Sequence, residues 1–157
     1  MRLRRSPLMI ALLATMALAG CHSKTATPVA ATPATVNVQH LNGSTEVKKH
    51  PQRIVVLDYA SLETLQLLGV EPLALPGNRK NLPDSLKRYQ DDKYLNAGTL
   101  FKPDMAVLRA AKPDLILIAG RASKAYDELN ALAPTLNMSV DPQDQLGSLK
   151  QRTLQLG

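Results

Sequence analysis

The clearest feature of the chain is a pair of short, unbroken apolar runs. Residues 54–57 read IVVL and residues 115–119 read LILIA. Such runs are typical of parallel strands that are buried on both faces of a sheet. Shorter apolar segments predict further strands at residues 72–75 and 136–140. Another short strand is predicted to end at residues 96–98.

Apolar residues at helical spacing predict helices between these strands. Residues 61–68 place three leucines on one face, with Ser61 as the predicted N-cap and Gly69 just past the end. Further helices are predicted at residues 103–111, beginning at Pro103, and at residues 123–132 and 145–156.

A hairpin is predicted before the first buried strand. Residues 36–47 alternate between apolar and polar positions and contain Asn42-Gly43, a strong hairpin signal. Residues 78–92 are polar and basic, which predicts a loop with one helical turn. Because strands alternate with helices of crossover length, the sequence predicts an α/β fold: a Rossmann-like parallel sheet with flanking helices. Residues 36–157 are enough for one such core.

The first twenty residues have the organisation of a lipoprotein signal peptide. Three arginines within residues 1–5 form a positive segment, residues 8–19 are apolar, and residues 18–21 read LAGC. This pattern predicts cleavage before Cys21 and a diacylglycerol thioether on its sulfur. The apolar segment is shorter than the ~20 residues that a membrane-spanning helix requires. The alternative is an ordinary secretory signal in which Cys21 stands there by chance.

Cys21 is the only cysteine, so its lipidation leaves no thiol for a disulfide or for nucleophilic catalysis. Such usage fits export to an oxidising compartment. Residues 21–35 are rich in Pro, Ala and Thr, which predicts an extended tether rather than part of a core. We therefore expect a periplasmic or extracytoplasmic protein that its lipid holds to a membrane.

The charge of the chain is partly a property of its signal peptide. The net charge is +6, and removal of residues 1–20 takes away three arginines and leaves +3. A small positive excess agrees with an anionic ligand. Nucleic acid is not an expected partner, because basic runs with interleaved aromatic residues are missing and Trp is absent.

Candidate ligand-binding residues follow the predicted strands. Arg121 comes directly after LILIAG, and the carboxyl edge of an open parallel sheet is where ligands bind. A guanidinium is a permanently charged fork that suits anions. Loops with Tyr59, and with Gly98 and Thr99, follow two other strands and should reach the same edge. Alternatively, Arg121 caps a helix or pairs with Asp127, and Thr99, like Ser61, acts as a helix cap.

Catalytic and metal-binding patterns find no support in the sequence. Gly-rich phosphate loops and a G-x-S-x-G elbow are missing. The chain has three histidines, and none of them is paired with an Asp, Glu or Cys at the spacing of metal ligands. They are His22, His40 and His50. We therefore expect no enzyme activity, no resident metal and no cofactor.

Several short motifs belong together. They are GTLF at residues 98–101, KPDL at 112–115, Gly120-Arg121, YDEL at 126–129 and APT at 133–135. This combination resembles the N-terminal lobe of the substrate-binding proteins of ferric-siderophore ABC importers, and is most similar to the branch that carries catecholate-type chelates. The resemblance covers residues 36–157.

The resemblance implies a two-lobed protein whose lobes are joined by a long helix, with the ligand between them. Residues 147–156 match only the beginning of that helix, so we expect a truncated or partial chain, or a second lobe encoded separately. In the family the arginine at the position of Arg121 contacts the chelate, and iron enters only as ferric siderophore.

The resemblance also implies partners in the membrane. A permease and its ATPase would receive the ligand, and surface glutamates of the lobes dock with arginines of the permease. Glu63 is the candidate here, and its alternative role is an ordinary solvated helix charge; Glu71 is a second acid of interest. Two other functions stay open: a haem or cobalamin carrier of the same fold, and a non-transport α/β lipoprotein without a small-molecule ligand.

Overall fold

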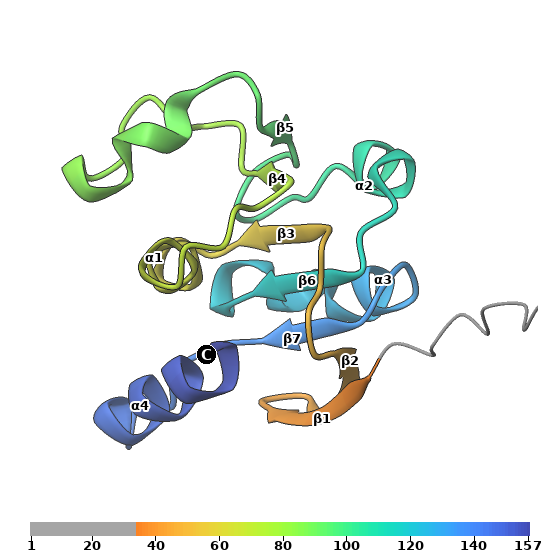
Figure 1. Cartoon of the computed structure of the whole chain (residues 1–157), viewed down its shortest axis with the longest axis vertical. Helices are drawn as coiled ribbons and strands as arrows, with labels where there is room; N and C mark the ends of the chain where they lie inside the picture. Colours follow the sequence, from red (N-terminus) through yellow and green to blue (C-terminus); the bar gives the residue numbers. More distant parts are fainter. Residues whose placement is uncertain (1–33) are drawn as a thin grey trace, which may run out of the picture. The chain divides into compact units, whose positions relative to one another are not determined.

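The computed structural model describes residues 34–157, which fold around a five-stranded parallel sheet of order β5-β4-β3-β6-β7 (Figure 1). The strands are β3 (Ile54–Leu57), β4 (Ala74–Leu75), β5 (Leu95–Asn96), β6 (Leu115–Ile118) and β7 (Thr135–Asn137). The predicted α/β class is confirmed. The predicted strands all form, and most are shorter than their apolar segments.

The two unbroken apolar runs form the centre of the sheet. β3 and β6 pair in parallel from Ile54 opposite Leu115 to Leu57 opposite Ile118, and every residue of both strands is buried. From β3 the chain moves outward through β4 to β5, then returns to the other side of β3 as β6. The strand order therefore reverses between β3 and β6, and the carboxyl ends of these strands flank a topological switch point.

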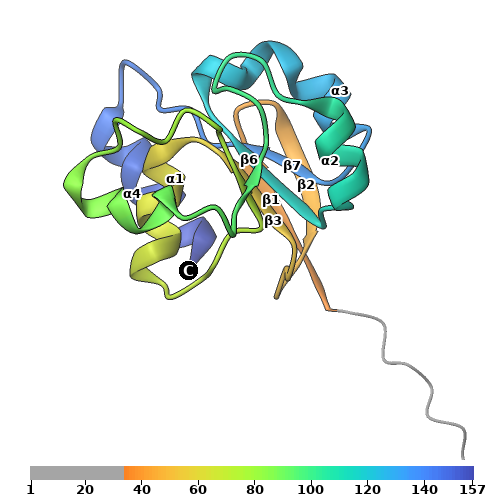
Figure 2. The ribbon, with the colours of Figure 1, turned by 90° about the horizontal axis from the view of Figure 1, so that it is seen from above.

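Helices cover both faces of the sheet (Figure 2). One face carries α1 (Tyr59–Leu67) and α4 (Gln145–Leu156), and the other carries α2 (Met105–Ala111) and α3 (Tyr126–Asn130). Two 3-10 helices, η1 (Asp84–Gln90) and η2 (Gly120–Ala125), complete the layers. β3 supplies both cores, because Ile54 and Val56 pack with α1 whereas Val55 and Leu57 pack with α2 and α3. None of the helices within residues 34–157 is both long and apolar enough to cross a membrane.

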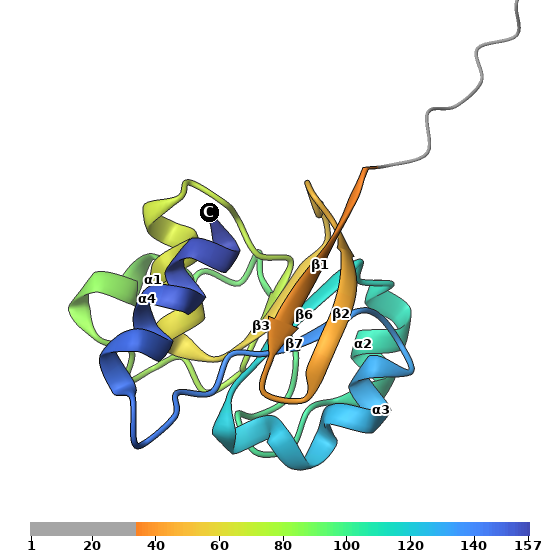
Figure 3. The ribbon, with the colours of Figure 1, turned by 90° about the horizontal axis from the view of Figure 1, so that it is seen from below.

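The predicted hairpin is confirmed. β1 (Thr35–His40) and β2 (Gly43–Lys48) pair antiparallel, and Val38 and Val47 pack in the core on the α1 face of the sheet (Figure 3). The turn itself lies one residue earlier than the Asn42-Gly43 signal indicates. Gly43 pairs across from His40, with a φ of +117° that favours glycine.

The predicted helix starts were wrong in three places. Asp58, not Ser61, is the N-cap of α1, and Asp104 rather than Pro103 precedes the first residue of α2. The helix expected at residues 123–132 is a 3-10 segment followed by the short α3. In each case the side-chain or backbone bonds of the first turn, rather than the apolar spacing, determine where the helix begins. The predicted helix at residues 145–156 forms as α4.

The KPDL motif joins the end of α2 to the start of β6, and its Asp114 contacts the residues that lead into β3. Lys112 is the C-cap of α2 and has a left-handed φ of 47°. The Asp114 carboxylate accepts the backbone N–H groups of Gln52 at 3.1 Å and Arg53 at 2.8 Å, and the Lys48 ammonium at 3.4 Å. Arg53 in turn donates from Nε to the Lys112 carbonyl at 3.0 Å. The motif therefore has a structural function away from the carboxyl edge of the sheet.

The environment of Asp114 sets its ionisation. Burial by itself would raise the pKa of this carboxyl, but the N–H groups of Gln52 and Arg53 and the Lys48 ammonium outweigh burial and lower the pKa. A carboxyl with a lowered folded-state pKa stabilises the fold above its unfolded pKa of about 3.9, and the contribution is lost as pH falls through the folded pKa.

Asp114→Asn should therefore lower the free energy of unfolding at pH 7 by about 1–2 kcal/mol, because an amide cannot replace the charge-assisted bonds. Urea unfolding of both proteins at pH 7 and pH 3 measures this difference. The difference should narrow at pH 3, because that pH lies below the unfolded pKa and protonation of the unfolded chain removes part of the stabilisation. Asp92→Asn, an exposed loop change, is the matched control. A difference of equal size at the two pH values would contradict the account.

Candidate functional site

Loops from four neighbouring strands meet at the carboxyl edge of the sheet. We define the carboxyl edge by six residues that follow β3, β4, β5 and β6: Tyr59, Asn78, Arg79, Gly98, Thr99 and Arg121. Because β4 and β6 lie on either side of β3, the loops that carry Arg79 and Arg121 flank Tyr59. The structure thus brings the four predicted ligand-binding residues to one edge.

Arg121 lies at the switch point, three residues beyond Ile118, the last residue of β6. Its side chain is exposed, in the first turn of η2. Within residues 34–157 it makes no ion pair and no side-chain hydrogen bond, so the alternative pairing with Asp127 does not form. Its guanidinium is therefore exposed and unpaired in the described part of the chain.

Tyr59 lies half-buried between the two arginines. Its hydroxyl donates to the Asn78 carbonyl at 3.2 Å, which ties the end of β3 to the loop after β4. Burial raises the pKa of Tyr59, and the positive charges of Arg121 and Arg79 offset part of that rise. The phenol is therefore neutral near pH 7, and both guanidinium groups lie close enough to act on it.

Gly98 and Thr99 shape the loop after β5. Gly98 has a φ of +90°, and a Cβ there would lie 2.5 Å from both the Asp104 nitrogen and the Lys102 carbonyl oxygen. The N–H of Thr99 donates to Lys102 O at 2.9 Å, and its hydroxyl oxygen accepts the Lys102 N–H at 2.9 Å. The backbone N–H of Thr99 is thus used inside the loop, and the hydroxyl proton of the exposed Thr99 has no acceptor among the described residues.

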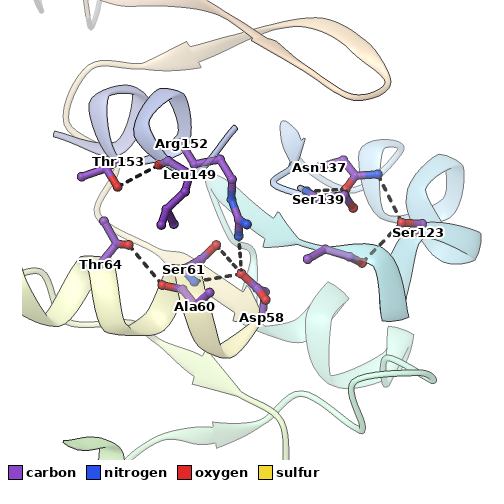
Figure 4. A network of polar contacts seen from close by, with 11 residues as sticks. Asp58, Ala60, Ser61, Thr64, Ser123, Asn137, Ser139, Leu149, Arg152 and Thr153 are labelled. Atoms are coloured by element: carbon purple, nitrogen blue, oxygen red, sulfur yellow. Dashed lines mark hydrogen bonds and ion pairs between the residues drawn. The ribbon is translucent and has the colours of Figure 1, made fainter. Parts of the chain in front are cut away.

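Asp58, the residue before Tyr59, is largely buried and joins the N-terminus of α1 to α4 (Figure 4). Its carboxylate accepts the Ser61 N–H at 2.8 Å and the Ser61 hydroxyl at 2.7 Å. It also pairs with Arg152 of α4 at 3.0 Å, and the two side chains are only 15% and 11% exposed. α4 buries none of its own residues fully, so this ion pair is a principal attachment of the helix to the edge.

Sequence reasoning missed three of these side chains. Asp58 could have been found from its place immediately before the first helical residue. Arg152 could not, because it pairs across 94 residues of chain. Arg79 lies in the polar stretch that was predicted only as a loop.

The two glutamates differ in their surroundings. Glu63 is exposed on α1 and accepts the Ser85 hydroxyl at 3.0 Å. Glu71 lies in a network with Arg88, Lys93 and the Tyr94 hydroxyl, the last at 2.6 Å. Glu63 is therefore the more accessible of the two.

Hollows of the surface lie away from the carboxyl edge. One of about 680 Å³ is at the opposite edge of the sheet, lined by the hairpin, the start of β3 and the end of α1. Another of about 290 Å³ lies between β1 and α4 and includes Arg152. Neither hollow is lined by the six residues of the carboxyl edge, so charge and topology identify this edge as the candidate site.

Possible metal ligands do not gather in the described part of the chain. Residues 34–157 contain no group of three or more His, Cys, Asp or Glu side chains that could hold an ion. His40 is occupied structurally, with Nε2 at 2.8 Å from the Thr45 hydroxyl, and burial lowers its pKa. The predicted lipidation site, Cys21, lies outside the described residues.

Comparison with known proteins identifies relatives by sequence. No profile of a described protein family matches the chain. It is 36% identical over 123 residues to the petrobactin-binding protein YclQ of Bacillus subtilis, covering 78% of this chain and 39% of that protein. It is 31% identical over 148 residues to the ferric-anguibactin-binding protein FatB of Vibrio anguillarum, covering 89% and 45%. A putative ABC transporter substrate-binding lipoprotein of Bacillus subtilis, YhfQ, is 37% identical over 119 residues, covering 71% and 36%.

Solved structures agree with the sequence relatives. The catecholate-siderophore-binding protein VctP of Vibrio cholerae superposes with a TM-score of 0.74 at 40% identity, over 79% of this chain and 44% of VctP. The chain thus spans less than half the length of these relatives, which are two-lobed binding proteins. The resemblance stated from the motifs is confirmed: the relatives are siderophore-binding proteins of the periplasmic-binding-protein family, and the chain is similar to one lobe of their fold.

Proposed function

We propose that this chain is a lobe of the solute-binding component of an ABC importer that captures a ferric siderophore and delivers it to a membrane permease. The observation that carries the proposal is the exposed guanidinium of Arg121 at the switch point of the sheet, next to the neutral Tyr59 hydroxyl. Relatives that bind ferric chelates support it.

The chemistry of the edge suits an anionic chelate. A guanidinium presents paired N–H donors to anionic oxygens, and charge-assisted bonds of this kind are stronger than neutral ones. The iron is cargo that arrives already wrapped in its chelator. Tyr59 can pack its ring against the chelator, and the Thr99 hydroxyl can donate to it.

The importer supplies the remaining partners. In this proposal Cys21 carries the lipid that holds the protein to the extracytoplasmic face of a membrane, and residues 21–35 form the tether. Glu63, exposed on α1, is the docking residue for an arginine of the permease. A second lobe closes over the carboxyl edge and completes the charge around the ligand.

Arg121→Ala should weaken binding of a ferric tris-catecholate to the chain by roughly ten- to a hundredfold, because a charge-assisted bond is lost. Titration calorimetry measures the affinity. Arg121→Lys should recover only part, since a point charge does not reproduce a planar fork. Thermal unfolding without ligand should change little, because the side chain is exposed.

Two results would count against the proposal. Saturable binding that Arg121→Ala leaves intact would remove the arginine from the ligand site. A dissociation constant below about 1 μM for this chain alone would contradict the claim that the lobe supplies only one side of the ligand site. One lobe leaves the anion half hydrated, so the chain alone should bind weakly.

Cys21 should be the membrane anchor. Labelling of cells with a palmitate analogue should tag the wild-type protein and should not tag Cys21→Ser, because the thioether forms on that sulfur. Fractionation should find the variant released from the membrane, because the acyl chains that anchor the protein are then missing. Equal labelling of both proteins would refute lipidation at this position.

A further inference from the structure

A second arginine stands at the carboxyl edge on the other side of Tyr59. Arg79 follows β4, Tyr59 follows β3 and Arg121 follows β6, and these three strands are consecutive neighbours in the sheet. The hydroxyl bond from Tyr59 to the Asn78 carbonyl brings the Arg79 loop against α1. The order of the strands in the sheet therefore determines where Arg79, Tyr59 and Arg121 lie relative to one another.

The loop of Arg79 is held at several points. The Arg79 N–H donates to Gly77 O at 2.9 Å, and Gly77 donates to Gly98 O at 2.7 Å. Gln90 of η1 donates to the carbonyls of Arg79 at 3.0 Å and Lys80 at 3.1 Å. The backbone of Arg79 is thus fixed from three neighbouring elements, as a preorganised binding residue requires.

The guanidinium of Arg79 differs from those of other arginines in the lobe. Arg88 pairs with Glu71, and Arg152 pairs with Asp58. Nε and Nη1 of Arg79 are shielded from solvent and find no acceptor within residues 34–157. A shielded donor without an acceptor costs free energy, so a small movement of this side chain that gave it an anionic oxygen to bind would be favourable.

The carboxylate nearest to this pair in sequence does not cancel its charge. Asp58 precedes Tyr59 directly, but its Oδ2 accepts from Arg152 and from the N–H and hydroxyl of Ser61, so its charge is already paired with Arg152. The edge therefore presents two guanidinium groups without a matching carboxylate. Two fixed charges favour a ligand with several negative charges over one that is nearly neutral.

We propose that Arg79 and Arg121 form a two-arginine subsite around Tyr59 that selects highly anionic ferric tris-catecholates over nearly neutral ferric trihydroxamates. The inference rests on the proposed function, and assigns to Arg79 the second charge that sets ligand class. Arg79 donates to outer catecholate oxygens from the β4 side, and Arg121 does so from the β6 side. The ring of Tyr59 separates the two guanidinium groups.

The test compares two chelates in NMR titrations of the purified chain, with gallium(III) in place of iron(III) to keep the probes diamagnetic. Arg79→Gln should weaken binding of the tris-catecholate by roughly tenfold or more and leave the trihydroxamate affinity unchanged. Arg79→Lys should recover part of the loss. Lys80→Gln, which removes one charge from an exposed side chain of the same loop, should have little effect on either.

The outcomes separate the inference from the proposed function. If the wild-type chain binds the tris-catecholate and Arg79→Gln binds it equally well, the subsite is refuted while the proposed function stands. Equal losses in Arg79→Gln and Lys80→Gln would also refute it, in favour of diffuse charge. A lower melting temperature with loss of both chelates would make Arg79 structural. A wild-type chain that binds neither chelate refutes the proposed function and the inference together.

Discussion

The parallel pairing of β3 with β6 is the constraint on which the rest of the lobe depends. Both strands are apolar throughout and buried on both faces, so they can lie only at the centre of a covered sheet. Their register fixes where each strand ends. Tyr59 and Arg121 stand side by side at the switch point because Leu57 lies opposite Ile118. The position of the candidate site is thus a consequence of hydrophobic burial.

Charge at the edge is arranged around this core in two layers. Asp58 and Arg152 pair below the surface, where removal of either partner would leave an uncompensated charge. That ion pair connects α4 to the N-terminus of α1. Because Asp58 is paired with Arg152, it does not neutralise the positive charges of Arg79 and Arg121. The resemblance predicts that α4 begins the interlobe helix, and in the proposed function the same ion pair orients that helix relative to the carboxyl edge.

The parts of the fold that follow from local pattern could be predicted from the sequence. The apolar runs of β3 and β6 and the hairpin are such cases, because each depends on residues close in the chain. The placement of Arg121 at the carboxyl edge could be predicted, since it follows the clearest strand, and its contact with a ligand stays a prediction. The N-cap of α1 was assigned to Ser61 because Ser61 directly precedes the first leucine of the apolar pattern, whereas the structure begins the helix two residues earlier, with Asp58 as the cap. Arg79 was missed because its placement depends on tertiary bonds from Tyr59 and Gln90.

The central claim is that the carboxyl edge of the sheet is the wall that meets the ferric chelate. Paramagnetic broadening tests it most directly, because a bound iron(III) complex broadens the amide signals near it, and a gallium(III) complex gives the diamagnetic reference. The account predicts that a ferric tris-catecholate broadens the amides of Tyr59, Arg79, Thr99 and Arg121 and spares Asp114 at the opposite edge. Broadening centred on Asp114 and the hollow beside the hairpin, with the carboxyl edge unaffected, would contradict it.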